Sequence, residues 1–375
     1  MKFKEIYKNI DSLYISFKGA LKEGIRETLE QKKSFAQSDD EKIQALATLI
    51  LDDHCFEVMD KGKGKYAFVL VDGWYHLQVS SSISKRLPTV YVQVSSDLLH
   101  CYGSYIALNQ LRGLVAELLV DIEEEIISRV DIFVDFTSDA KFESIGKGSW
   151  VTRANNIHSY WSGNNFTGWS IGQGGVISAR LYDKTVEIEK SGKDYFKSIW
   201  EKNGWQSGQR IWRLEFQLRR EFLSQMSMNK FFEFAESSND VWRYCTHDWL
   251  RLTVNGGSRN RARFESHRVW DKIQQVKFDS GNYTGIMRHV EKSRLPKDKT
   301  MFLNGMGYLT SFAVSRGHKT INDQVLKEFM HDGGKFLNEY TKSSPTYSDK
   351  DDYINTKIRL KEKKFSTRTE ENEWD

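Results

Sequence analysis

The sequence is poor in the residues and runs that mark several classes of protein. Its three cysteines, Cys55, Cys101 and Cys245, are odd in number and far apart, which argues against a disulfide framework and a cysteine-based metal site. Three prolines in 375 residues argue against long disordered linkers, and no uncharged apolar stretch approaches the ~18 residues that would span a membrane. The first residues lack the continuous apolar core of a secretory signal. We therefore expect a protein of the reducing cytoplasm, with no membrane partner.

Charge is unevenly distributed along the chain, although the net charge is only +4. Residues 251–300 hold twelve Lys and Arg against five Asp and Glu, whereas residues 117–143 hold nine acidic against two basic residues. A basic region beside an acidic one suits a metal-dependent enzyme acting on nucleic acid, because cations hold phosphates and clustered carboxylates hold a divalent ion. Solvated faces of ordinary helices and loops would give the same composition, so charge alone leaves both interpretations open.

The periodicity of apolar residues predicts an α+β protein with a central, mainly antiparallel sheet flanked by helices. We expect a helical N-terminal segment over 1–64, a sheet domain over 65–276, a helical C-terminal portion over 277–345 and a polar tail over 346–375. Strands are expected at 66–71, 74–80, 89–95, 128–136, 168–172, 176–186 and 210–219, with a helix from about 96 to 125 and mostly helix over 220–276.

Three of these strands share an alternation of apolar and ionisable residues. RVDIFVDF (129–136), ARLYDK (179–184) and WRLEFQLR (212–219) each have one apolar face and one face with charged groups. If the three pair in one sheet, one surface gathers Asp131, Asp135, Glu215, Tyr182 and Lys184. A half-exposed sheet with surface ion pairs shows the same alternation, so the pattern alone does not choose between an active site and an ordinary surface.

An active site made of these residues would have coherent chemistry. Its three carboxylates are hard oxygen ligands of the kind that Mg²⁺ and Mn²⁺ prefer, and such an ion would polarise a phosphate oxygen. Tyr182 would attack a phosphodiester, with a cation such as Lys184 stabilising the phenolate. The products would be a phosphotyrosyl enzyme and a free hydroxyl.

A short basic run is a second candidate for contact with phosphate. It places Arg259, Arg261 and Arg263 within five residues, where the guanidinium groups repel one another unless an anion is bound. A surface loop paired with nearby acidic residues is the alternative. The segment GQGG at 172–175 is too short for a nucleotide-binding loop and is expected to be a hairpin turn, and the sequence has no G-x-x-x-x-G-K-[ST] motif.

Four blocks in a fixed order give the sequence a likeness to a known family. They are R-x-D-x-x-x-D from 129, G-W-x-I-G from 168, R-x-Y-D-K with a later Glu from 180, and R-x-E-x-x-x-x-R from 213. With VWRYCTHDWLRL, RARF and Trp270 they resemble the replication initiation factor family, over about residues 65–275. Its members are rolling-circle replication initiators of plasmids and filamentous phages, related to the relaxases of some integrative conjugative elements.

The resemblance implies a DNA strand transferase with the fold of the two-His endonucleases and a catalytic domain over 65–276. Tyr182 would be the nucleophile that joins the 5′ phosphate and leaves a 3′ hydroxyl as primer. Carboxylates would take the place of the His pair of related nickases, and the chain has no His-hydrophobic-His pair. The implied metal ligands for Mg²⁺ or Mn²⁺ are Asp131, Asp135, Glu215 and Glu187, of which Glu187 breaks the alternation of its strand unless a bulge or turn intervenes. The expected DNA contacts are Arg129, Arg180, Arg213, Arg219, Arg259, Arg261 and Arg263.

The expected function is a sequence-specific nickase and ligase that starts rolling-circle replication of a plasmid or filamentous phage. It would act by two transesterifications through a phosphotyrosine, without ATP. Its partner would be origin DNA, recognised as a duplex and nicked as a single strand, with a host helicase and a second copy of the chain as further candidates. A conjugative relaxase and a non-catalytic origin-binding protein of the same fold are the alternatives. Use of a second tyrosine, Tyr160 or Tyr195, is left open, as is stacking of unpaired bases on Trp161, Trp169, Trp200 or Trp205.

Overall fold

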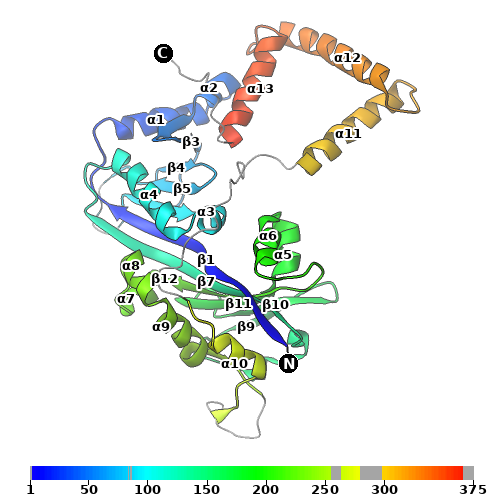
Figure 1. Cartoon of the computed structure of the whole chain (residues 1–375). Coiled ribbons are helices and arrows are strands. Elements are labelled where there is room, and N and C mark those ends of the chain that lie inside the picture. Colours follow the sequence, from blue (N-terminus) through cyan, green and yellow to red (C-terminus); the bar gives the residue numbers. More distant parts are fainter. Residues whose placement is uncertain (1, 83, 85–86, 255–262, 279–297, 366–375) are drawn as a thin grey trace. The chain divides into compact units, whose positions relative to one another are not determined.

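The computed structural model describes residues 2–82, 84, 87–254, 263–278 and 298–365 (Figure 1). These residues form two compact units. Unit 1 is built from the described parts of Met1–Gly19, Val90–Val115 and Asp121–His289. Unit 2 is built from those of Ala20–Thr89, Ala116–Val120 and Val290–Asp375. Each unit therefore combines segments that are distant in the sequence.

Unit 1 contains an antiparallel sheet with the strand order β6-β1-β7-β12-β11-β10-β9. The predicted α+β class is confirmed, and the strands expected at 89–95, 128–136, 168–172 and 210–219 are present. The strands of this sheet are β1 (Phe3–Lys18), β6 (Val90–Val94), β7 (Glu124–Ser138), β9 (Ile157–Ser162), β10 (Asn165–Ile171), β11 (Ile177–Asp183) and β12 (Trp212–Arg219), while β8 (Trp150–Thr152) and β13 (Leu250–Leu252) form a separate pair.

The prediction of helix from the first residue onward is wrong, because Phe3–Lys18 is the strand between β6 and β7. The buried side chains of β1 include Ile6, Ile10, Leu13 and Phe17, whose spacing of four, three and four residues is that of a helix face. The pairing of β1 with β7 shifts register at three places. Each such irregularity moves the inward-facing set by one residue, so a bulged strand imitates helical spacing in the sequence.

Strand β11 ends at Asp183, earlier than the strand expected over 176–186. The Asp183 carboxylate accepts a hydrogen bond from the backbone N–H of Val186 at 3.2 Å and caps the N-terminus of α5 (Lys184–Ser191). Lys184 and Glu187 therefore lie three residues apart on the first turn of a helix, where such side chains are neighbours. This turn into helix explains why Glu187 does not follow the alternation of β11.

The apolar face of the unit 1 sheet is covered by helices from its C-terminal part (Figure 1). Phe216 of β12 contacts Trp242 and Trp249, with ring centroids 5.4 and 6.2 Å apart. The predicted mostly helical stretch over 220–276 is confirmed, although it contains β13. Its helices are α7 (Arg220–Gln225), α8 (Phe231–Glu236), α9 (Ser238–Arg243), the π-helix η3 (Tyr244–Trp249) and α10 (Arg268–Gln274).

The charged face of the same sheet is partly covered by α3 (Ser96–Cys101), α5 and α6 (Tyr195–Lys202). Phe133 of β7 packs there against Ile188, Phe196 and Trp200. The rest of this face stays open beside β9, β10 and β11, where a pocket lies. Two 3₁₀ turns, η1 (Phe142–Ser144) and η2 (Lys147–Ser149), connect β7 to β8.

Two further sequence expectations concern connections between these elements. The helix expected over 96–125 is divided at Gly103, whose φ is +86°, into α3 and α4 (Ser104–Leu118), and the chain is extended again from Glu124. The hairpin turn predicted at 172–175 is confirmed, because β10 and β11 pair directly on either side of it.

Unit 2 combines an antiparallel sheet with helices from both ends of the sequence. Its strands are in the order β2-β3-β4-β5, which confirms the strands expected at 66–71 and 74–80 and corrects the prediction of helix before residue 65. The elements are α1 (Ile25–Ala36), α2 (Glu41–Ala45), β2 (Thr48–Leu51), β3 (His54–Val58), β4 (Phe68–Val71), β5 (Tyr75–Val79), α11 (Asp298–Ser315), α12 (Asp323–Lys342) and α13 (Lys350–Phe365).

The segment from 346 onward was expected to be a polar tail, but its described part forms α13. This helix packs on α2, and its Lys357 donates to the Glu41 carboxylate at 2.5 Å. Lys42 of α2 in turn pairs with Asp352 at 2.5 Å. Charged residues of the expected polar tail therefore form ion pairs with α2. No helix among the described residues is long and apolar enough to cross a membrane.

The core above the apolar face gives a stability prediction. Because Phe216 is fully buried between the sheet and the tryptophans of α9 and η3, we expect Phe216→Ala to lower the free energy of unfolding by about 3–5 kcal/mol. Phe232→Ala, at an exposed position of α8, is the control and should change it by less than about 0.5 kcal/mol. Equilibrium urea denaturation measures both. Equal losses of stability in the two variants would contradict the burial of Phe216 between the sheet and these helices.

Candidate active site

The charged face predicted from alternation exists, and β7, β11 and β12 build it side by side. The register pairs Arg213 directly with Asp135 and with Tyr182, and Glu215 with Arg180. Directly opposed residues of neighbouring strands point to the same face. The residues that the sequence pattern grouped on one surface therefore do meet, with Lys184 following at the end of β11.

Tyr182 and Glu215 form the centre of the group. The Tyr182 hydroxyl donates a hydrogen bond to Glu215 Oε2 at 3.1 Å, and the other carboxylate oxygen of Glu215 pairs with the Arg180 guanidinium. Burial raises the pKa of Tyr182 well above the usual value, and the negative charge of Glu215 adds to this rise. Tyr182 is thus a neutral phenol beside a carboxylate that can accept its proton.

Two cations flank the ring of Tyr182. The Arg180 guanidinium carbon and Lys184 Nζ each lie 5.7 Å from the ring centroid. Lys184 is buried and pairs with Glu187 in the first turn of α5. Burial, with the positive charge of Arg213, lowers the pKa of Lys184. Arg180, by contrast, is half exposed, and the charge of Glu215 raises its pKa.

Arg213 lies beneath these groups and is fully buried. Its Nε and second guanidinium nitrogen donate to the two oxygens of Asp135 at 2.6 and 2.8 Å, and its remaining nitrogen donates to Asp11 Oδ1 at 2.7 Å. Trp200 Nε1 also donates to Asp135, at 2.9 Å. The predicted phosphate-binding role of Arg213 does not agree with this placement, because its charge is already compensated by two carboxylates.

Asp131 and Arg129 form a third pair, two residues apart on the same face of β7. Arg129 donates to both carboxylate oxygens, at 2.7 Å for Nε. Burial raises the pKa of Asp131 to about 7, although the hydrogen bonds from Arg129 lower it and the negative charge of Glu215 raises it further. Asp131 therefore titrates near neutrality.

Asp11 and His100 complete the group, and the alternation pattern predicted neither of them. Asp11 lies at a register shift of β1, where alternation fails, and it lines the pocket. Burial opposes its ionisation, but the charge of Arg213 and the hydrogen bond from His100 hold its pKa well below the usual range. His100 of α3 lies 3.4 Å from Asp11 and 3.1 Å from the Tyr7 hydroxyl. Only the topology brings β1 and α3 to this face.

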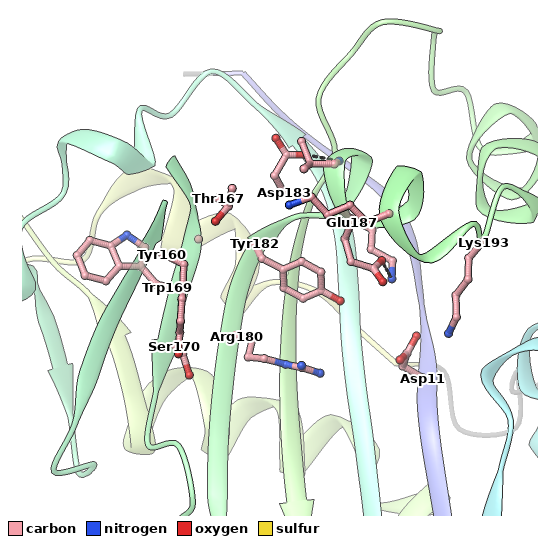
Figure 2. Close-up of a pocket in the computed structure, with 14 residues that line it drawn as sticks. Asp11, Tyr160, Thr167, Trp169, Ser170, Arg180, Tyr182, Asp183, Glu187 and Lys193 are labelled. Atoms are coloured by element: carbon pink, nitrogen blue, oxygen red, sulfur yellow. Dashed lines mark hydrogen bonds and ion pairs between the residues drawn. The ribbon is translucent and has the colours of Figure 1, made fainter. Parts of the chain in front are cut away.

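A pocket of about 410 Å³ opens beside Tyr182. Figure 2 shows the side chains of Tyr182 and Arg180 next to one another, projecting from the same strand. Lys190 and Lys193 add two more cations to the lining, and Tyr160 lies at the end opposite Lys193. The pocket thus combines a tyrosine, whose hydroxyl is hydrogen-bonded to the buried carboxylate of Glu215, with a group of cations, which suits attack on an anionic ester.

The predicted metal ligands do not form a metal centre in this arrangement. Each is compensated by a cation, namely Asp131 by Arg129, Asp135 by Arg213, Glu215 by Arg180 and Glu187 by Lys184. Among the described residues, no three His, Cys, Asp or Glu side chains are grouped so that they could hold a metal ion. The donor set as arranged fits ion pairing, and the Mg²⁺ or Mn²⁺ site stays a prediction.

The remaining predicted residues lie away from this group. Arg219 is exposed at the end of β12 and donates to the Gly174 carbonyl at 3.5 Å. Arg263 is exposed, and Arg259 and Arg261 fall outside the described residues. Of the four tryptophans considered for stacking, Trp161 is exposed, whereas Trp169, Trp200 and Trp205 are buried. Of the two further tyrosines, Tyr160 lines the pocket and Tyr195 hydrogen-bonds to Ser96 at 3.2 Å.

Comparisons with known proteins find a similar solved structure but no similar sequence. No family model matches the chain, and no curated protein sequence matches it. The solved structure of the rolling circle replication initiator protein from Geobacillus stearothermophilus aligns with 74% of this chain and 99% of that chain, at a TM-score of 0.44 and 13% identity.

The raised pKa of Asp131 predicts how pH acts on stability. A carboxyl whose pKa is higher in the folded than in the unfolded chain stabilises the fold at low pH, and this contribution is lost as pH rises through the folded value of about 7. The free energy of unfolding of the wild type, relative to Asp131→Asn, should therefore fall between about pH 4 and pH 7. Urea denaturation of both proteins over this range tests it. A difference independent of pH would contradict the assignment.

The ion pairs of Arg213 give a second prediction. Arg213→Met would leave Asp135 and Asp11 buried without their cation, so we expect a loss of about 3–5 kcal/mol in the free energy of unfolding. The matched control is Arg316→Met, which removes an exposed pair with Asp332 and should cost at most about 1 kcal/mol. A comparable loss in both variants, measured by urea denaturation, would rule out a special role for the buried pair.

Proposed function

We propose that the protein is a DNA strand transferase that nicks and rejoins one strand at an origin and so starts rolling-circle replication. The observation that carries the proposal is the hydrogen bond from Tyr182 to Glu215 in a pocket lined by cations. The family resemblance of the blocks around these residues supports it. The 5′-phosphotyrosyl intermediate, the metal and the kind of element served are parts of the same proposal.

In the first step, Tyr182 Oη attacks the phosphorus of the scissile phosphodiester. Its proton passes to Glu215 Oε2, which already accepts its hydrogen bond, and a bond forms between the phenol oxygen and phosphorus. The bond between phosphorus and the 3′ oxygen breaks, and that oxygen takes up a proton. Lys184 is a suitable acid, because burial and the charge of Arg213 lower its pKa.

The cations of the pocket would hold the phosphate during this exchange. Arg180 is half exposed beside Tyr182, and Lys190 and Lys193 also line the pocket. Fixed positive charges next to a reacting phosphate stabilise the charge that develops on its oxygens. Rejoining reverses the step, since a 3′ hydroxyl attacks the phosphotyrosine and releases Tyr182. The ester bond conserves the energy, so no ATP is required.

A divalent ion, Mg²⁺ or Mn²⁺, belongs to the proposal because the family resemblance implies one. When bound, it would act as a Lewis acid on a phosphate oxygen. Binding by Asp131, Asp135 or Glu215 would require their arginine partners to move, so the steps above assign it no position.

Covalent trapping tests the proposal. The purified protein is incubated with Mn²⁺ and single-stranded oligonucleotides tiled across its own gene, then run on a denaturing gel. We expect a slower-migrating protein–DNA adduct, absent with Tyr182→Phe. Glu215→Gln should form it about 10²- to 10⁴-fold more slowly, because the base that accepts the proton is lost. Loss of the adduct in EDTA would support the metal.

The other outcomes separate the alternatives. An adduct that persists in Tyr182→Phe would identify another nucleophile and overturn the assignment. Absence of an adduct on every tile, with DNA binding intact, would favour a non-catalytic origin-binding protein of the same fold. A conjugative relaxase would form the same adduct, and only transfer of the joined strand to a second cell distinguishes it.

A further inference from the structure

The pocket beside Tyr182 has two chemically different ends. Arg180, Lys184 and Lys193 line one end, together with the carboxylates of Asp11 and Glu187, whereas Tyr160, Gly168 and Ser170 line the other. Tyr160 and Lys193 lie at opposite ends of the pocket in Figure 2. The end with Tyr160 offers an aromatic ring, a hydroxyl and bare backbone. These groups suit an uncharged planar ligand and not a phosphate.

Strand register explains how this end is formed. Tyr160 of β9 and Tyr182 of β11 are both direct partners of Gly168 in the intervening strand, so all three positions belong to one face. With neighbouring strands about 4.8 Å apart, the two tyrosines leave the sheet roughly 10 Å apart. In an ordinary sheet, the side chain of the middle strand would fill that space. Here the middle residue is a glycine.

Gly168 cannot be replaced without disturbing Tyr182. A Cβ atom at this position would lie 2.4 Å from the carbonyl oxygen of Leu181 and 2.8 Å from the Cβ of Tyr182. Real Cβ atoms do not come this close to such neighbours, so the backbone of β11 would have to shift. Gly168 therefore allows β11 to hold Tyr182 in its present position. It also leaves the surface of the sheet between the rings of Tyr160 and Tyr182 without a side chain.

The hydroxyl of Tyr160 is hydrogen-bonded, whereas its aromatic ring is exposed. Its hydroxyl donates to Gln173 Oε1 at 3.3 Å, from the turn between β10 and β11. The residue is 47% exposed, and among the residues that the structure describes no ring contact involves it. A fixed aromatic ring with an open face is the kind of platform on which unpaired bases stack.

We propose that the Tyr160 and Gly168 end binds the base of the unpaired nucleotide next to the scissile phosphate, stacked on Tyr160. The phosphate of that nucleotide then meets Arg180 and Tyr182 at the cationic end. This inference rests on the proposed function for its choice of ligand. The pocket of about 410 Å³ holds a ligand of the size of one nucleotide. Because every base has an aromatic face, this contact positions the strand without selecting its sequence.

Binding of single-stranded DNA tests the inference without requiring cleavage. Fluorescence anisotropy with labelled oligonucleotides tiled across the gene gives the affinity of the wild type and the variants. Tyr160→Leu should weaken binding about ten- to a hundredfold, as expected for loss of one base stack, while Tyr160→Phe keeps the ring and most of the affinity. Trp161→Leu is the matched control, since Trp161 is an exposed aromatic residue on the same strand whose side chain points to the other face.

An abasic site moved along the bound oligonucleotide ties the effect to one base. At one position of the oligonucleotide, the abasic site should weaken binding by the wild type. It should not weaken binding by Tyr160→Leu, because the stack between ring and base is already lost in that variant. Equal affinities of Tyr160→Leu and wild type, or equal losses in Tyr160→Leu and Trp161→Leu, overturn the inference. If the binding assays give the expected pattern but the trapping experiment yields no covalent adduct, the base site is upheld and the nicking mechanism is overturned. Absence of all single-stranded DNA binding overturns both.

Discussion

The candidate site depends on a guanidinium that is fully enclosed by the protein. Arg213 satisfies Asp135 and Asp11 at once and packs its charged plane 3.6 Å from the centre of the Phe133 ring. Removing one partner of such a group leaves an uncompensated buried charge, which is far more costly than losing a surface pair. The ion pairs of Arg213 with Asp135 and Asp11 link β12 to β7 and β1 through their side chains. Tyr182, directly opposite Arg213 in the register, is thereby held in place.

In this site, one set of residues holds the strands in position and another set is placed to react. Arg213 and Asp135 are buried and ion-paired, with Asp11 as the second partner of Arg213, whereas Tyr182 and Arg180 line the pocket and both bond to the buried Glu215. The buried charges also act on the residues of the pocket. Burial lowers the pKa of Lys184, and the positive charge of Arg213 lowers it further. A neutral tyrosine hydrogen-bonded to a carboxylate, with cations on one side and an open aromatic ring on the other, suits an ester that carries both a phosphate and a base.

Alternation in the sequence could predict the shared face because β7, β11 and β12 pair without register shifts, so the two-residue period holds along each strand. The same rule failed for β1, whose irregular pairing produces helical spacing, and it therefore missed Asp11. Partners could not be predicted either. Arg213 with Asp135 and Arg180 with Glu215 are cross-strand neighbours, and only the register shows that these two expected metal ligands, Asp135 and Glu215, face arginines. Asp and Glu are suited to both roles, so residue type does not distinguish them.

The most direct test of the central claim is to identify the amino acid joined to DNA. The covalent adduct is digested with nuclease and trypsin, and the peptides are analysed by mass spectrometry. Cleavage after Arg180 and Lys184 releases Tyr182 in a peptide of four residues. The account predicts that this peptide carries a nucleotide joined through phosphate to the tyrosine. The same modification on Tyr160, Tyr195 or any other residue, with this peptide unmodified, would contradict it.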